Sequence, residues 1–299
     1  MQILDGKAIS NDIKNELRQA VADIARQDGK IPHLCAILVG DNPASHAYVN
    51  NKVRFCKEVG FEHTVIRLPQ TTTQAQLITQ VERLNQASNI DGFIVQLPLP
   101  AHIDADTVLQ AINPDKDVDG FHPANIGRMT LGLPSFIPAT PMGILELLKR
   151  YNIETSGKHC VVVGRSNIVG TPMSILLSRS SNPGNCTVTL CHSKSGDLSL
   201  YTKQADILIA AIGKPNFITA QHVKPGAVVI DVGINRINTD DNGSKLVGDV
   251  DFDAVAPLCS YITPVPGGVG AMTVAALLLN TLRANKLAAE RKQAYAAVN

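Results

Sequence analysis

Lys52 is the residue whose position first suggests chemistry. Asn42-Pro43 is a good helix start, so a helix is expected to open there and to end near Gly60. At about 100° per residue, Lys52 falls in the middle of an apolar arc, formed by Ala44, Phe55, Tyr48, Val59, Cys56, Val49 and Val53. Either the lysine stem packs while its ammonium reaches solvent, or the amine is desolvated. Desolvation lowers the pKa of a lysine and lets it exchange protons near neutral pH.

Two other segments with polar side chains could meet this lysine. Gln96 lies near the end of an expected strand over residues 92–97, and open sheets bind ligands at the carboxyl ends of their strands. The alternative for Gln96 is a hydrogen bond that closes the following loop. Asp117 and Asp119 lie just before Gly120, a pattern that turn formation alone also explains.

A glycine-containing loop in the second half of the chain indicates a nucleotide. A strand expected over residues 158–163 runs into Gly-Arg-Ser-Asn-Ile-Val-Gly-Thr-Pro at 164–172 and then into a helix. Such a turn exposes backbone N–H groups at the positive end of a helix, where a pyrophosphate binds. Ser166 stands where the usual fingerprint has its middle glycine, so an ordinary strand-to-helix turn remains the alternative.

The next strand favours NADP over NAD. It is expected over residues 186–191 and is followed by His-Ser-Lys, with no carboxylate until Asp197, whereas NAD enzymes place an acid here for the ribose. Arg165 and Ser193 could instead donate hydrogen bonds to a 2′-phosphate. Ile234, after a strand expected over 227–232, is expected to line the nucleotide site, although a Gly-Ile turn that ends the core is equally consistent.

A strand and helix alternation must position these residues. In the first half we expect helices over 7–27, 43–60, 74–87 and 105–112 and strands over 34–40, 64–68 and 92–97, before an irregular segment to 138. In the second half we expect helices over 140–151, 168–180 and 271–289 and strands over 158–163, 186–191, 206–212 and 227–232. Several strands are apolar on both faces, which is typical of a parallel sheet covered by helices.

The expected fold is therefore a two-lobed α/β protein. Residues 1–138 form an α/β substrate domain, residues 139–270 form a Rossmann-like NADP-binding domain, and the C-terminal helix in 271–299 returns to the first lobe.

Composition argues against several classes of function. The 299 residues carry 27 Lys and Arg against 26 Asp and Glu, only 4% aromatics and no Trp, so we expect no nucleic-acid partner. The six cysteines show neither Cys-x-x-Cys nor zinc spacing, which predicts reduced thiols and no metal. No apolar run reaches the ~18–20 residues of a membrane span, and the start lacks signal-peptide features. We expect a cytoplasmic protein that does not bind membranes.

Six segments, in order along nearly the whole chain, resemble the bifunctional methylenetetrahydrofolate dehydrogenase/methenyltetrahydrofolate cyclohydrolase (FolD) family. They are Tyr48-x-x-x-Lys52, Val95-Gln96-Leu97-Pro98-Leu99-Pro100, Lys116-Asp117-Val118-Asp119-Gly120, Val163-Gly164-Arg165-Ser166, Cys191-His192-Ser193 and Pro264-Val265-Pro266-Gly267-Gly268-Val269-Gly270. The resemblance implies oxidation of 5,10-methylenetetrahydrofolate by NADP⁺. It also implies hydrolysis of the methenyl product to 10-formyltetrahydrofolate in the same cleft, usually within a homodimer.

The resemblance also assigns roles to residues. It makes Lys52 the catalytic lysine, Tyr48 a neighbour that shapes the pocket, Gln96 the amide that positions lysine and substrate, and Asp119 the carboxylate that holds the pterin. The folate-binding walls are then Val95, Leu97 and a loop with Pro266, Gly267 and Gly270, and the cofactor contacts are Gly164, Arg165, Ser166, Ser193, Thr140 and Ile234. Ala271 departs from the proline frequent in the family, which predicts a looser helix start.

The two reactions make different demands. Hydride loss from the one-carbon bridge gives a cation stabilised by two nitrogens, so the oxidation needs alignment more than an acid or base. Hydrolysis needs proton transfers, which suit a desolvated lysine. Two alternatives remain: an NADP-linked dehydrogenase of similar design for another substrate, and a non-catalytic nucleotide sensor. The second would leave Lys52 without a role.

Overall fold

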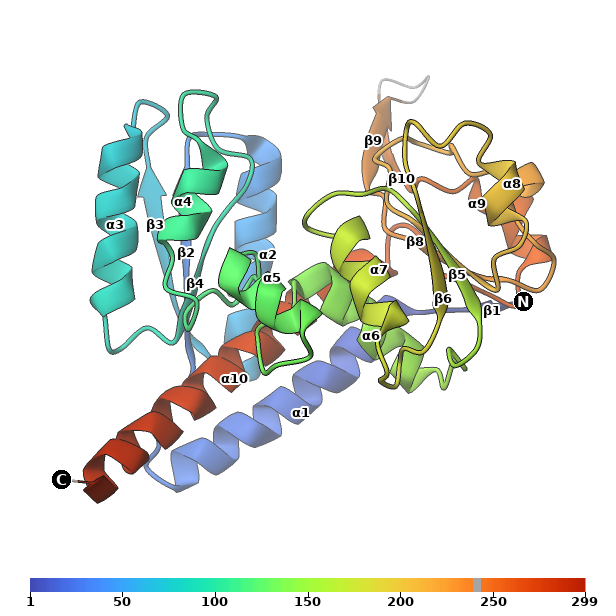
Figure 1. Cartoon of the computed structure of the whole chain (residues 1–299). Helices are drawn as coiled ribbons and strands as arrows, with labels where there is room; N and C mark the ends of the chain where they lie inside the picture. Colours follow the sequence, from blue (N-terminus) through green and yellow to red (C-terminus); the bar gives the residue numbers. More distant parts are fainter. Residues whose placement is uncertain (239–242, 299) are drawn as a thin grey trace. The chain divides into compact units, whose positions relative to one another are not determined.

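The chain folds as two compact units. The computed structural model describes residues 1–238 and 243–298, with residues 295–298 as backbone only (Figure 1). Unit 1 comprises Met1–Asn11 and Thr140–Thr273, and unit 2 comprises Asp12–Ala139 and Val274–Asn299. Helices α1 (Gly6–Arg26) and α10 (Val269–Val298) have residues in both units. The domain boundaries expected from the sequence stay predictions.

Unit 2 is built on a small parallel sheet in the order β3-β2-β4. Its elements are β2 (His33–Val39), α2 (Pro43–Val59), β3 (Glu62–Leu68), α3 (Gln74–Gln86), β4 (Gly92–Val95), α4 (Ala105–Ala111) and α5 (Pro123–Thr130). The residues of β2 and β4 are all buried, as expected for strands covered on both faces.

The two faces of this sheet have different neighbours. One hydrophobic cluster joins Ile37 and Val95 of the sheet to Leu77 of α3 and Val108 of α4. Because side chains alternate along a strand, Gln96 must leave the chain on the face opposite to Val95. That opposite face is the one from which Gln96 reaches α2.

Unit 1 contains a six-stranded parallel sheet in the order β1-β11-β8-β7-β5-β6. Its strands are β1 (Gln2–Ile3), β5 (His159–Val163), β6 (Thr187–Cys191), β7 (Ile207–Ala210), β8 (Val228–Asp231) and β11 (Tyr261–Ile262). Its helices are α6 (Ala139–Arg150), α7 (Gly170–Ser178), α8 (Ser199–Thr202), η1 (Ala220–His222), α9 (Phe252–Val255) and η2 (Ala256–Leu258), with an antiparallel hairpin of β9 (Asn235–Asn238) and β10 (Ser244–Val247).

The order of these strands marks a ligand site. From β5 the chain proceeds to β6 on one side, and β7 then lies on the other side of β5. This reversal is the switch point at which Rossmann-like sheets bind nucleotides. The expected α/β architecture with a Rossmann-like domain is confirmed.

Several local expectations were wrong. Helix α5 lies within the segment expected to be irregular, with Pro123 in its first turn and the His122 side chain accepting a hydrogen bond from Ala124 N. Helix α10 begins at Val269, so Ala271 lies in an established first turn, and the looser start expected there is not found.

The peptide bonds before Pro98, Pro183 and Pro266 are cis.

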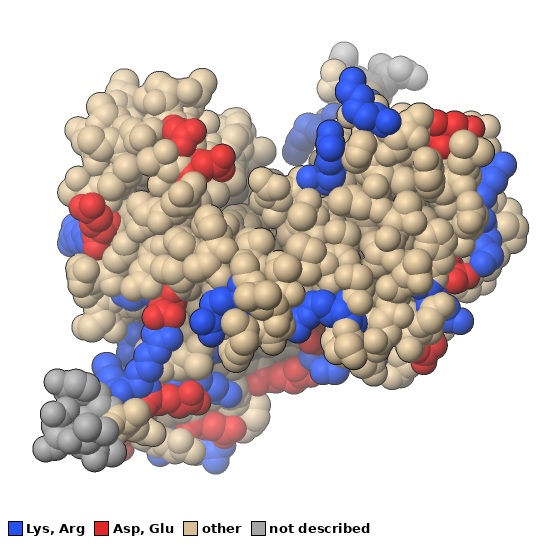
Figure 2. All heavy atoms as spheres, in the orientation of Figure 1, with Lys and Arg blue, Asp and Glu red and all other residues tan. Residues whose placement is uncertain are grey.

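The surface and the cysteines agree with the composition. Figure 2 shows charged side chains of both signs intermixed on the face drawn. All six cysteines are buried and free. Within the described residues, no helix combines the length and hydropathy that a membrane span requires, and no cluster of His, Cys, Asp and Glu could hold a metal ion.

Candidate active site and cofactor site

Helix α2 places Lys52 on its buried face. The buried residues of this helix are Ser45, Val49, Lys52, Phe55, Cys56 and Val59, a stripe at helical spacing with Lys52 in its middle. Lys52 is 9% exposed, whereas Tyr48 is 44% exposed. The stripe is therefore rotated slightly from the arc read in the sequence, and Tyr48 lies at its margin.

Gln96 holds the amine of Lys52. Lys52 Nζ donates a hydrogen bond to Gln96 Oε1 at 3.0 Å. Gln96 Nε2 donates to the carbonyl oxygen of Leu97 at 2.7 Å, and Gln96 N donates to Ile37 O at 2.9 Å. The bond from Gln96 Nε2 to Leu97 O fixes which end of the side-chain amide faces the lysine, because only Oε1 is then left to accept a hydrogen bond from Lys52 Nζ.

Burial disfavours charge on both Lys52 and Asp119. Desolvation lowers the pKa of Lys52, and the Asp119 carboxylate opposes this shift only in part. Desolvation likewise raises the pKa of Asp119, opposed by Lys52 and reinforced by Asp117. Each group is thus moved toward its neutral form, which is what a group that gives and takes protons near neutral pH requires.

The two acids beside Gly120 have different partners. The Asp117 carboxylate is buried and accepts hydrogen bonds from the backbone N–H groups of Gly120, Phe121 and His122 and from Asn125 Nδ2. No described residue donates a hydrogen bond to the Asp119 carboxylate. Asp117 therefore stabilises the turn, and Asp119 keeps its oxygens available for a ligand.

Two other residues expected near the folate, Val95 and Leu97, differ in their exposure. Leu97 is partly exposed and follows Gln96 directly. Val95 was expected in the folate-binding wall, but its side chain lies in the core between the sheet, α3 and α4, because it alternates with Gln96.

The loop after β5 approaches a second loop at the switch point of unit 1. Gly164 has φ +119° and donates its N–H to Cys191 O at 2.9 Å, and a Cβ on it would collide with the carbonyl oxygen of Ala211. A Cβ on Gly170 would likewise collide with Gly164 O. Only glycine allows this close packing of backbone, which makes the cradle that a pyrophosphate needs.

Ser166 explains the departure from the usual glycine pattern. Its Oγ accepts hydrogen bonds from Val169 N at 3.2 Å and Gly170 N at 3.4 Å, at the start of α7. The serine therefore stabilises the turn itself, a role that a glycine could not fill.

A cavity of about 610 Å³ lies over these loops. It is lined by Val163, Gly164, Arg165, Ser166, His192, Ser193, Gly196, Asp197, Leu198, Ala211, Ile212, Lys214, Phe217 and His222. Its volume is in the range of ligand and cofactor sites. Four expected cofactor residues line it, namely Gly164, Arg165, Ser166 and Ser193. The donors of Arg165, Ser193 and Lys214 fit a 2′-phosphate, and the one carboxylate in this lining, Asp197, accepts a hydrogen bond from Ser199 N.

Lys214, Phe217 and His222 also line this cavity, and sequence reasoning missed them. Lys214 Nζ lies 5.4 Å from the centre of the Phe217 ring, and that ring stacks on His222 with centroids 6.2 Å apart. The signal that could have found them is Gly213-Lys214-Pro215, which follows the strand next to β5 at the same sheet edge.

Ile234 and Thr140 are not among the lining residues of this cavity. Ile234 is 42% exposed, and its side chain lies against Gly270 in the first turn of α10. The hydroxyl of Thr140, in the first turn of α6, hydrogen-bonds Thr273 Oγ1 at 3.0 Å. In the loop that precedes α10, Gly267 O accepts a hydrogen bond from Lys7 N at 2.9 Å, and Pro266 is exposed.

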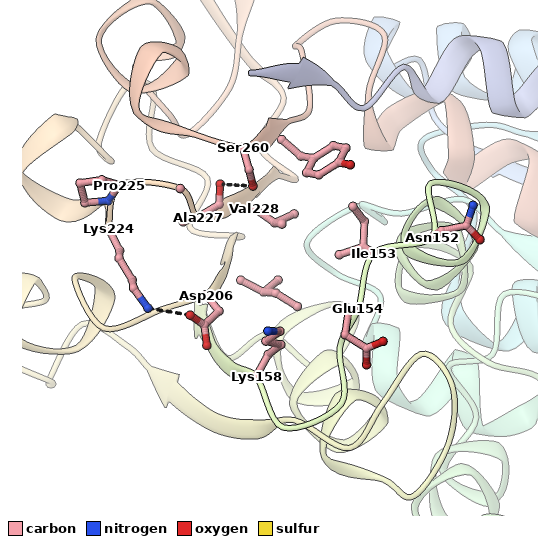
Figure 3. A pocket seen from close by; sticks show the side chains of 13 residues that line it. Asn152, Ile153, Glu154, Lys158, Asp206, Lys224, Pro225, Ala227, Val228 and Ser260 are labelled. Atoms are coloured by element: carbon pink, nitrogen blue, oxygen red, sulfur yellow. Dashed lines mark hydrogen bonds and ion pairs between the residues drawn. The ribbon is translucent and has the colours of Figure 1, made fainter.

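A second cavity in unit 1, of about 330 Å³, lies at the other end of the sheet (Figure 3). Its lining includes the residues that directly precede β5, β7, β8 and β11, namely Lys158, Asp206, Ala227 and Ser260. Lys224 Nζ and Asp206 Oδ1 form an ion pair there at 2.6 Å. These residues mark the amino ends of the strands, whereas the expected cofactor residues follow the carboxyl ends.

Comparison with known proteins gives one family. The tetrahydrofolate dehydrogenase/cyclohydrolase catalytic domain matches residues 4–119, and the NAD(P)-binding domain of the same family matches residues 138–289. A bifunctional protein FolD of Cytophaga hutchinsonii is 60% identical over 289 residues, which cover 96% of this chain and 100% of that protein.

Solved structures agree. The crystal structure of the bifunctional enzyme FolD from Campylobacter jejuni is 48% identical with a TM-score of 0.90, over 96% of this chain and 99% of that one. The Trypanosoma brucei FolD, complexed with NADP cofactor and inhibitor, is 38% identical with a TM-score of 0.90, over 95% and 97% of the two chains. Because both domains of the family match and relatives are alike over nearly the whole chain, the chain belongs to the tetrahydrofolate dehydrogenase/cyclohydrolase family.

Proposed function

We propose that the two reactions of this enzyme are served by different residues, with proton transfer assigned to Lys52 in unit 2 and cofactor binding to the switch-point loops of unit 1. The chain is a bifunctional enzyme. It oxidises 5,10-methylenetetrahydrofolate to the methenyl cation with NADP⁺ and hydrolyses that cation to 10-formyltetrahydrofolate.

Lys52 is the proton carrier of the hydrolysis. Water adds to the cationic one-carbon bridge, and the neutral amine of Lys52 accepts a proton from the adduct. The lysine then returns that proton to the leaving ring nitrogen as the bond between this nitrogen and the one-carbon bridge breaks. The hydroxyl of the adduct loses its proton to water and becomes the formyl carbonyl, which is the one net proton released. The observation that carries this role is the partly buried hydrogen bond from Lys52 Nζ to Gln96 Oε1, in surroundings that lower the pKa of the amine.

Gln96 and Asp119 position the reactants. The Gln96 amide is held by Leu97 O and keeps the lysine at a fixed place. The Asp119 carboxylate, which receives no hydrogen bond from a described residue, accepts hydrogen bonds from the N–H groups of the pterin. Such donors stabilise the ionised carboxylate and so oppose the upward shift that burial causes in the pKa of Asp119. Tyr48 at the margin of the stripe, Leu97, and the loop with Pro266, Gly267 and Gly270 complete the folate contacts.

The loops of unit 1 hold NADP. Gly164 and Ser166 present the pyrophosphate cradle, and Arg165 and Ser193 receive the 2′-phosphate, with Thr140 and Ile234 as further contacts. NADP⁺ bound there would supply the hydride acceptor for the oxidation. The protein's contribution to this step is alignment, because the reaction needs no acid or base.

We also infer that the enzyme works as a homodimer in the cytoplasm, without nucleic-acid or membrane partners. Six buried, unpaired cysteines support a reducing compartment. The domain division at residues 138 and 270 belongs to the same proposal.

A coupled assay of both steps tests the proposed function. The purified chain is given methylenetetrahydrofolate with NADP⁺ or NAD⁺, and methenyltetrahydrofolate is supplied separately without cofactor. We expect oxidation with a clear preference for NADP⁺, and faster decay of the methenyl compound than in buffer alone. Absence of either activity would contradict the corresponding assignment.

A further inference from the structure

Two buried aspartates lie behind the cofactor cavity and have no role in the chemistry described so far. Asp231 is the last residue of β8 and is 3% exposed, and Asp249 follows β10 and is fully buried. A carboxylate is almost never fully buried unless it is paired or hydrogen-bonded. Their partners therefore show what each of them does.

The Asp249 carboxylate binds the loop after β7. Its Oδ2 accepts hydrogen bonds from Ile212 N at 2.6 Å and Gly213 N at 2.9 Å, and its Oδ1 accepts from Lys214 N at 2.9 Å and Asn235 Nδ2 at 2.9 Å. Three successive backbone N–H groups thus converge on one anion. Such a run of N–H groups is an anion-binding nest, and here the anion belongs to the protein.

The same loop lines the cofactor cavity. Ile212 and Lys214 are lining residues, as is Ala211, whose carbonyl oxygen packs against Gly164. Asp249 itself is not a lining residue, so it meets the cavity only through this loop.

Asp231 fixes the segment that carries Asp249. Its Oδ1 accepts from Asp249 N at 2.9 Å and from Gly233 N at 2.9 Å, and its Oδ2 accepts from Val250 N at 2.9 Å. A Cβ on Gly248 would collide with this carboxylate, so glycine makes room for it. Burial raises the pKa of Asp231 to about 6 against the effect of its three donors.

We propose that Asp249 is a positioning residue for the NADP site, whose carboxylate holds residues 212–214 in the conformation that presents Ile212 and Lys214 to the cofactor. The inference rests on the proposed NADP site and deepens it. Without the anion, three backbone N–H groups would face one another in a buried space with no acceptor, and a buried donor without a partner is costly. The loop must then turn outward, and the floor of the cavity changes with it. Further along, Asn216 N donates to Gly248 O and Ile218 N to Asp249 O, so the rest of the loop stays attached.

Asp249→Asn tests the proposal. Asparagine keeps the size of the side chain but replaces one acceptor oxygen by an NH₂ group, and each oxygen accepts two N–H groups, so either orientation of the amide creates a donor–donor conflict. We expect the Kd for NADP⁺, measured by titration calorimetry, to rise about tenfold or more. We expect the KM for NADP⁺ to rise in parallel, while hydrolysis of methenyltetrahydrofolate without cofactor stays within about twofold of the parent.

Asp206→Asn is the matched control. Asp206 is also in unit 1 and also accepts a backbone N–H, from His159 at 2.9 Å, but it lies at the amino ends of the strands (Figure 3). This variant is expected to lower the melting temperature and to leave the Kd for NADP⁺ within about twofold of the parent. If it weakens NADP⁺ as much as Asp249→Asn does, the effect is general destabilisation and the proposal is wrong.

A milder variant decides the matter if Asp249→Asn does not fold. Asn235→Ala removes one of the four donors and leaves the anion in place, and it is expected to raise the Kd for NADP⁺ about two- to fivefold. If Asp249→Asn does not fold, an unchanged Kd for NADP⁺ in folded Asn235→Ala would overturn the proposal. A parent chain that binds no NADP⁺ would instead overturn the proposed cofactor site, so the two failures can be told apart.

Discussion

The two sites of this enzyme are built in opposite ways. In unit 2 the proposed functional groups are side chains on buried elements, and Lys52 is only 9% exposed. In unit 1 Arg165, Ser166 and Ser193 are exposed on loops, and much of the site is backbone. The difference follows from the tasks, because proton transfer near neutral pH needs a lysine whose pKa is lowered by burial, whereas phosphate binding needs donors presented to a charged ligand.

The largest effect is expected from Lys52→Met. The variant keeps the length of the stem but has no proton to give or take, so hydrolysis of methenyltetrahydrofolate should fall about 10²- to 10⁴-fold. Its Kd for NADP⁺ should stay at the parental value, because the cofactor loops belong to unit 1. Hydrolysis at the parental rate in the purified variant would remove the assignment of Lys52.

Arg165→Ala tests the proposed cofactor site in unit 1. Loss of a guanidinium bound to a phosphate should raise the KM for NADP⁺ about ten- to a hundredfold and change that for NAD⁺ much less. Hydrolysis without cofactor serves as the internal control and should not change. Equal losses for the two nucleotides would contradict the assignment of the 2′-phosphate to Arg165.

A double variant, Lys52→Met with Asp119→Asn, should be more stable than the parent. Both ionisable groups have pKa values shifted against their charged forms by burial. Met and Asn have no charge to desolvate, so the free energy of unfolding should rise, by about 1 kcal/mol. Urea unfolding at pH 7 measures the gain, and a less stable double variant would show that the charged pair stabilises the unit.

The pH dependence of this gain has a definite sign. Because burial raises the pKa of Asp119, this group contributes most favourably to the free energy of unfolding at low pH. Its contribution falls as the pH rises through the pKa that Asp119 has in the folded state. Because burial lowers the pKa of Lys52, this group contributes least favourably to the free energy of unfolding below the pKa that it has in the folded state. Its contribution recovers as the pH rises toward the pKa of a free lysine. The advantage of the double variant should therefore be largest near neutrality and shrink toward both acidic and strongly alkaline pH.

The smallest effect is expected from Ser45→Ala. The Ser45 hydroxyl lies on the same buried face of α2 as Lys52 and has no hydrogen-bond partner among the described residues. Because alanine also favours a helix more than serine, the free energy of unfolding should rise by about 0.5 to 1 kcal/mol. A loss of hydrolysis in this variant would extend the active site along α2 and sharpen the contrast with unit 1.

Sequence reasoning succeeded where the signal is local. The spacing of apolar residues along one helix was enough to place Lys52 in the middle of the α2 stripe, and one strand–loop–helix run was enough to locate Gly164 and Arg165. The same periodicity misplaced Tyr48, because the exact line of contact between α2 and the sheet depends on tertiary packing. Helix α5 was missed because Gly127 and the prolines around it weaken the helical pattern.

The parts that were missed are assembled from distant segments. Lys214 lines the cavity together with Arg165, and Asp249 holds the loop of Lys214 from 35 residues further along the chain. No short window of sequence contains both partners, so only the strand order of the fold shows that they meet. Val95 was misplaced for a related reason: its motif identifies a site, and only the strand register tells which side chains face it.

The C-terminal helix has a consequence for how the enzyme is made. Asn280 donates hydrogen bonds to the carbonyl oxygens of Val118 and Ile137, and Asn285 donates to Lys30 O across 255 residues of chain. A ribosome that adds about 5 to 20 residues per second needs roughly 13 to 50 s between Lys30 and Asn285. In the later part of that interval the segment around Asp119 is already made but lacks the helix whose Asn280 binds the neighbouring Val118, so unit 2 stays incomplete until Asn280 and Asn285 have been added.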